Sequence, residues 1–201
     1  MALATYSDLQ TAIAGHLHRS DLTSVIPDLI VLAENRIYGD LNSRQQDTVT
    51  NLSTVASQEY VSLPSDFINA RTVVCPAVDE VLDYKAPDQF AKIFISGATG
   101  YPTAYTIVGS NLYLSPVPDS AYTLRMVYQQ KVPALSSGTN WLMTNFPAVY
   151  LYASLCAAAP YLKDDNRLPV WEQIYKESIQ AVNSQDWSSM ANMTVRGDVT
   201  L

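Results

Sequence analysis

Apolar residues near the start of the chain recur at helical spacing. The stripe of the first segment comprises Leu9, Ala12, Ile13, His16 and Leu17, and that of the second comprises Ile26, Leu29, Ala33 and Ile37. Positions three and four apart share one face of an α-helix, so the pattern predicts two helices. The first has Thr5 or Ser7 as its N-cap, and the second runs from about Ser24 to Leu41. The pair forms a helical hairpin with one apolar face.

The period changes to two residues between about Thr48 and Lys131. Strand-like runs follow one another as EYVSLP, RTVVC, VDEVLDY and AYTLRMVYQQ. Within APDQFAKIF, Pro87 suits the first turn of a short helix. The two prolines of SPVPDS cannot donate to a central ladder, so we expect a strand to end there. The segment is therefore predicted to be rich in antiparallel strands.

The stretch YTIVGSNLYLSP predicts a β-hairpin whose two turn residues are Gly109 and Ser110. A type II′ turn needs positive φ at its first central position, which glycine adopts at low cost. Alternation then gives the hairpin one apolar face, formed by Tyr105, Ile107, Leu112 and Leu114. The mixed face carries Thr106, Val108, Asn111 and Tyr113. We expect the apolar face to pack against the strand from Tyr122 to Tyr128.

Helical patterns return after residue 131. NWLMTNFPAVYLYASLCAAAPYL is apolar on nearly every side, and Pro147 is placed for a helix start. A last helix is striped by Trp171, Ile174, Tyr175, Ile179 and Val182. The predicted fold is α+β: residues 1–47 and 132–187 contribute helix pairs to one bundle, and residues 48–131 are an inserted antiparallel β-rich segment. Residues 188–201 are expected to form an extended C-terminal tail.

Composition narrows the classes of function. The chain of 201 residues is 48% hydrophobic and 15% charged, with a formal net charge of −7. That charge disfavours sequence-independent binding to nucleic acid, which relies on Lys and Arg. No run is long enough to span a bilayer, so we expect a soluble protein. Cys75 and Cys156 lack metal-ligand spacing and are interpreted as free buried thiols. Neither a metal nor a cofactor is predicted.

No motif for catalysis is apparent. His16 and His18 lie two residues apart on a helix and do not face together. Asp164 and Asp165 are best interpreted as caps and solvated charge between two helices, although an acid and base pair in a hydrolase is the alternative. We therefore predict that the protein is not an enzyme.

A ligand- or carbohydrate-binding β module is a further alternative. In this hypothesis Tyr101, Tyr105 and Tyr113 form a stacking surface for sugars. The expected hairpin register argues against it, because Tyr105 and Tyr113 fall on opposite faces.

Several stretches taken in order resemble the head-to-tail adaptor, or connector, proteins of tailed bacteriophages. The matching pieces are TYSDLQTAIAGHLHRSDL, IPDLIVLAENRI, LPSDF, GYPTAYTIVGSNLYLSPVPDSAYTLRMVY and TNWLMTNFPAVYLYASLCAAAPYLKDDNRLPVWEQIY. The resemblance implies a virion protein of the head-tail interface, assembled in the host bacterial cytoplasm. It implies a ring, dodecameric in known relatives, between the portal and the tail or nozzle proteins. DNA would pass through its lumen without specific binding, and no membrane would be involved.

The resemblance also suggests two contact regions. The C-terminal extension of such proteins reaches the portal, and by position its candidate residues here are Trp187, Met190, Met193, Val195, Val199 and Leu201. The mixed face of the hairpin, Thr106, Val108, Asn111 and Tyr113, is a candidate for contact with a neighbouring subunit or a tail protein.

Overall fold

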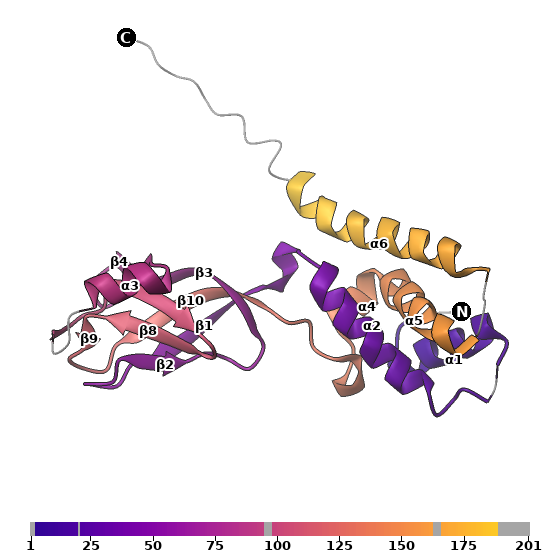
Figure 1. Ribbon diagram of the computed structural model, residues 1–201, viewed down its shortest axis with the longest axis horizontal. Helices are drawn as coiled ribbons and strands as arrows, with labels where there is room; N and C mark the ends of the chain where they lie inside the picture. The colour runs from indigo at the N-terminus through magenta and orange to yellow at the C-terminus, as the bar shows by residue number, and fades with distance from the viewer. Residues whose placement is uncertain (1–2, 20, 95–97, 163–165, 189–201) are drawn as a thin grey trace, which may run out of the picture. The chain divides into compact units, whose positions relative to one another are not determined.

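The computed structural model describes residues 3–19, 21–94, 98–162 and 166–188. The chain divides into two compact units (Figure 1). The helical unit comprises Met1–Arg44 and Val132–Leu201, and the β unit comprises Gln45–Lys131. All but one of the described α-helices lie outside the stretch that forms the sheets, which confirms the α+β class.

The helical unit contains five α-helices among its described residues. They are α1 (Tyr6–Leu17), α2 (Ile26–Asp40), α4 (Trp141–Asn145), α5 (Pro147–Leu162) and α6 (Leu168–Ser188). Helix α5 packs against the other four, which explains why its sequence is apolar almost all round. The core includes the predicted stripes of α1 and α2, except that His16 is exposed. On α6, Ile174 is only partly buried.

Local signals in the sequence set the helix ends. Thr5 caps α1 in a capping box. The side-chain oxygen of Thr5 accepts a hydrogen bond from the backbone N–H of Asp8, and the carboxylate of Asp8 accepts one from the backbone N–H of Thr5. Asn140 caps α4 by accepting from Met143 N–H at 2.9 Å. Pro147 begins α5, as expected, since a first-turn residue needs no N–H donor.

The helical core encloses one acid that the sequence interpretation did not single out. Glu34 is only 6% exposed, and its Oε1 accepts from Leu135 N–H at 2.7 Å. Burial raises the pKa of Glu34, and this hydrogen bond lowers it by less. The signal was present in the sequence: Glu34 lies four residues after Ile30 and three before Ile37, on the buried side of α2.

The described residues of the β unit form two four-stranded sheets and a two-stranded ribbon. The first sheet has the order β1 (Asp47–Ser53), β10 (Thr123–Gln130), β3 (Phe67–Cys75) and β4 (Glu80–Val81). The second has the order β2 (Tyr60–Ser62), β8 (Asn111–Ser115), β7 (Ala104–Val108) and β5 (Asp83–Tyr84). The ribbon pairs β6 (Thr99–Gly100) with β9 (Val117–Pro118). The pairs β5–β7 and β6–β9 are parallel and the others are antiparallel, so the segment is mixed rather than wholly antiparallel.

The predicted hairpin is confirmed as β7 and β8, residue for residue. Tyr105 pairs with Leu114, and Thr106 with Tyr113. The turn begins at Gly109, which has a φ of 62°. The apolar face shares one buried core with residues of β10, as expected; this core comprises Leu52, Val73, Cys75, Leu82, Tyr105, Leu112, Leu114, Leu124, Met126 and Tyr128. Both large sheets therefore bury one face against the same core.

The run VDEVLDY does not form the single strand that its alternation suggests. Its residues divide between β4 in the first sheet and β5 in the second. Between them, Leu82 is 4% exposed in the shared core, and its N–H donates to Val73 O. The next residue, Asp83, donates to Thr103 O instead. Burial of Leu82 thus fixes the point at which the chain passes from one sheet to the other.

Candidate functional site

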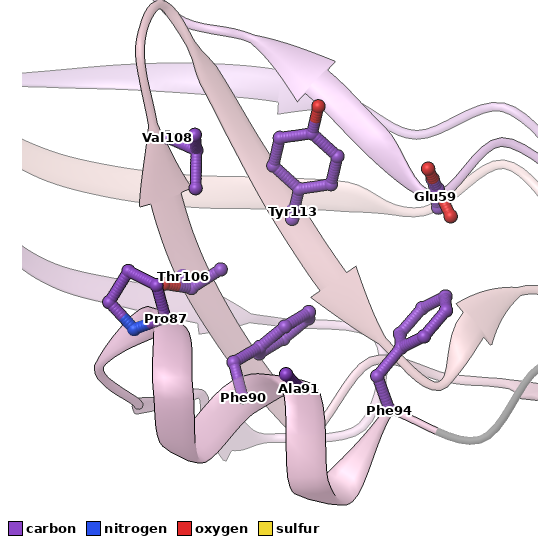
Figure 2. Close-up of a pocket in the computed structure, with 8 residues that line it drawn as sticks. All are labelled: Glu59, Pro87, Phe90, Ala91, Phe94, Thr106, Val108 and Tyr113. Carbon is purple, nitrogen blue, oxygen red and sulfur yellow. The ribbon is translucent and has the colours of Figure 1, made fainter.

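A short helix lies over the mixed face of the β7–β8 hairpin. This helix, α3 (Pro87–Ile93), contacts β7 and leaves an apolar groove beside the hairpin (Figure 2). The groove is lined by Glu59, Pro87, Phe90, Ala91, Phe94, Thr106, Val108 and Tyr113. Its volume is about 250 Å³. The groove brings together residues from three segments of the β unit.

The sequence of α3 explains its orientation. Pro87 lies in the first turn, and Asp88 places a negative charge near the helix N-terminus, where the backbone dipole favours it. Phe90 and Ala91 follow Pro87 by three and four residues, and Phe94 follows it by seven, so all four lie on one side. Phe90 is 7% exposed and stacks on Phe94 with ring centroids 5.8 Å apart. This side of α3 forms one wall of the groove.

The hairpin forms the opposite wall. Thr106 is 2% exposed, and its Oγ1 has no hydrogen-bond partner among the described residues. Val108 is 51% exposed at the groove edge. The partly buried ring of Tyr113 packs against Tyr60 with centroids 5.7 Å apart. Glu59, just before β2, contributes the one charged side chain of the lining.

Three of the four residues predicted on the mixed face line this groove. Thr106, Val108 and Tyr113 do so, whereas Asn111 is half-buried outside the lining. Thr106 lies too deep to form a broad contact with another chain. The role of this face as an interface stays a prediction.

Sequence interpretation did not connect α3 with the hairpin. The available signal was the spacing of Pro87, Phe90, Ala91 and Phe94, which marks an apolar helix side that needs a partner. Nothing in the local sequence distinguishes Glu59 as a lining residue.

The predicted portal-contacting residues lie at the limit of the described chain. Trp187 is within the backbone of α6, but its side chain is outside the described part. Met190, Met193, Val195, Val199 and Leu201 are outside the described residues, as are Asp164 and Asp165. The predictions for these positions stay untested by the geometry.

The three tyrosines of the carbohydrate hypothesis do not share a surface. Tyr105 is 4% exposed in the core between the sheets, with its ring against that of Tyr84. Tyr113 lines the groove on the opposite face of the hairpin, and Tyr101 is 46% exposed in a separate loop. The geometry therefore does not support a stacking platform built from these residues.

The helical unit has a second hollow of about 540 Å³. Its lining comprises Leu3, Ala12, Gly15, His16, His18, Leu151, Arg167 and Trp171. Arg167 donates to His16 O at 3.0 Å, and its guanidinium lies 4.8 Å from the centre of the Trp171 ring. These contacts hold the start of α6 against the end of α1, which gives Arg167 a structural role.

Within the described residues, no three His, Cys, Asp or Glu side chains are grouped as a metal site would require. Cys75 and Cys156 are both free and buried, and burial raises the pKa of the Cys156 thiol. In the same part of the chain, no helix combines the length and the hydropathy needed to cross a bilayer.

Comparison with known proteins supplies the family. No individual curated protein matches the chain. The family described as SU10 adaptor protein matches residues 4–197, which include both units. The match extends over nearly the whole chain and agrees with the resemblance carried by its sequence stretches. The chain therefore belongs to the SU10 adaptor protein family, a family of bacteriophage head-tail adaptors.

Proposed function

We propose that this protein forms a ring between the portal and the tail of a tailed bacteriophage, with DNA passing through the lumen. The observation that carries the proposal is the family match over residues 4–197. The expected ring is a dodecamer, as in known relatives of the family, and the role is structural rather than catalytic.

The C-terminal residues are proposed to hold the portal. The candidates are Trp187, Met190, Met193, Val195, Val199 and Leu201. Five of these six residues follow residue 188, in a stretch of sequence without a lasting helical or strand period. Their burial against the portal would stabilise the complex, because burial of apolar area drives most protein association.

The β unit is proposed to contact a neighbouring subunit or the tail proteins. Ten of the large apolar side chains that are exposed in the described residues belong to this unit: Val49, Val55, Tyr60, Ile68, Val78, Val81, Tyr84, Ile93, Tyr101 and Val108. Exposed apolar side chains support an interaction surface when they gather in one part of a protein. The net charge of −7 is compatible with a lumen that repels rather than retains DNA.

Electron microscopy of purified protein mixed with its cognate portal tests this function. Rings seated on portals are the expected result, and their subunit number can be counted in averaged end views. The matched control lacks residues 188–201 and should decorate fewer portals. Portals that stay undecorated by the full chain would contradict the adaptor role.

A further inference from the structure

We propose that the groove between α3 and the β7–β8 hairpin binds one large apolar side chain of a tail protein, beside a Lys or Arg that pairs with Glu59. The proposal rests on the adaptor function proposed above and names the chemistry of its tail-side partner. An aromatic side chain with a polar tip, Trp or Tyr, fits the groove best.

The size of the groove favours a side chain over a free small molecule. Its volume of about 250 Å³ is below the roughly 300–1,000 Å³ typical of small-molecule pockets. Seven of its eight lining residues are apolar, aromatic or threonine. Figure 2 shows Phe90, Phe94 and Tyr113 around the same hollow, so an inserted ring would meet aromatic side chains. Such contacts stabilise an aromatic guest beyond its burial alone.

The wall of the groove carries an unpaired polar atom. The Oγ1 of Thr106 is buried without a hydrogen-bond partner among the described residues. A buried hydroxyl left unpaired costs free energy, and a ligand that brings a donor or acceptor removes that cost. The indole N–H of Trp or the hydroxyl of Tyr provides such a group on an otherwise apolar side chain.

The charge at the groove edge selects a basic neighbour. Glu59 is exposed and forms no ion pair with another described residue. Lys92 belongs to α3 but does not line the groove. It follows Pro87 by five residues, so it lies on a different side of the helix from Pro87, Phe90 and Phe94. Lys or Arg on a partner can therefore pair with Glu59.

The same charge argument favours a different protein over a second copy of this chain. The β unit contains eight acidic and five basic residues, and the whole chain has a net charge of −7. A second copy would bring the same excess of negative charge toward Glu59, whereas a basic segment of a tail protein would be attracted to it. Each contact is weak by itself, but a ring presents the groove many times, so simultaneous contacts multiply the affinity.

A peptide titration tests the chemistry of the groove on the full chain. The probes are acetylated, amidated hexapeptides: Gly-Ser-Trp-Lys-Ser-Gly and its Trp-Glu counterpart. We expect saturable amide shifts in ¹⁵N NMR spectra at Ala91 and Val108, with the Trp-Lys peptide binding about two- to fivefold more tightly. The Glu59→Gln variant should abolish that preference. Equal binding of both peptides, or shifts away from the groove, would overturn the proposal.

Assembled particles test the partner. Val108→Asp introduces a charge at the groove, and Val31→Asp is the matched control because Val31 is 52% exposed, belongs to the helical unit and does not line the groove. We expect Val108→Asp to leave rings on portals but to reduce tail attachment about tenfold or more, the effect of a central interface residue. The control variant should retain both the rings on portals and the attachment of tails. Normal tail attachment in Val108→Asp, or loss of its rings from portals, would contradict a tail-binding groove.

A photo-crosslinking residue in place of Val108 identifies the occupant of the groove in assembled particles. Crosslinking to a tail protein at a Trp or Tyr beside Lys or Arg is expected. Crosslinking to a second copy of this chain would overturn the assignment. If the wild-type protein fails to decorate portals at all, the adaptor function fails, while the peptide titration still decides whether the groove binds its proposed ligand.

Discussion

Thr106 and Tyr113 are direct partners across the β7–β8 hairpin, yet their surroundings differ. Thr106 is 2% exposed and its hydroxyl lacks a partner among the described residues, whereas the ring of Tyr113 is only partly buried and packs on Tyr60. Both side chains point to the face that α3 partly covers (Figure 2). The position of α3 thus divides one predicted face into a buried part and an accessible groove.

Replacement of Gly109 by Val should destabilise the β unit by about 1–2 kcal/mol, because an L-residue at positive φ is strained. An added Cβ at Gly109 meets no atom within 4 Å, so the φ of 62° is the cause rather than a clash. Gly39 in α2 is the matched control: its Cβ would also meet nothing, and Gly39→Ala should stabilise by about 0.5–1 kcal/mol. Urea denaturation measures the change in the free energy of unfolding for both variants. Equal changes in the two variants would contradict the hairpin geometry.

Glu34→Gln should change how stability depends on pH. Because burial raises the pKa of Glu34, the folded chain binds this proton more tightly than the unfolded chain does. The resulting stability is fully present below the unfolded pKa and is lost as pH rises through the folded pKa. Glutamine keeps an acceptor for Leu135 N–H without the charge. The free energy of unfolding of the variant, relative to wild type, should therefore rise with pH.

A series of denaturation curves from acid to neutral pH measures this difference. Glu34→Ala is the control, because it also removes the carboxyl but leaves the N–H of Leu135 without its acceptor. Its free energy of unfolding should follow the same pH dependence as that of Glu34→Gln and lie about 1–3 kcal/mol lower. A Glu34→Gln curve parallel to that of the wild type would show that this carboxyl does not titrate differently on folding.

Asn140→Ala should weaken the helical unit. The side chain of Asn140 accepts from Met143 N–H at 2.9 Å and donates to Pro133 O at 2.7 Å and to the Tyr150 hydroxyl at 2.8 Å. Its loss leaves buried polar groups unpaired, which costs about 1–3 kcal/mol. Thermal unfolding measures the change. The exposed Ser184→Ala is the control and should shift stability by less than about 0.5 kcal/mol.

Removal of residues 188–201 should leave the fold intact and weaken portal attachment. The reason is that residues 188–201 show no lasting helical or strand periodicity in the sequence, so no apolar face of this stretch is expected to pack on the helical core. The melting temperature of the truncated chain should match that of the full chain, while its portal binding in sedimentation assays falls. A markedly lower melting temperature would show instead that these residues stabilise the fold.

Several local features of the fold follow directly from the sequence. Periodicity placed the strand from Thr123 to Gln130 and the stripes of α1 and α2, and the Gly109 turn fixed the hairpin register. These features depend on neighbours close in sequence, because turn conformation and side-chain alternation are local properties. The family resemblance carried by ordered stretches was likewise confirmed by the match.

Tertiary structure alone decided what covers each face. Alternation assigned Thr106 and Val108 to one side of the hairpin but could not show that Phe90 would pack there. Leu82 shows the same limit, since its burial in the shared core divides an alternating run between two sheets. Contacts between segments distant in sequence depend on which apolar faces pack together. Several such packing arrangements are compatible with the same local pattern of apolar and polar residues. The groove exists only because α3 and the hairpin meet.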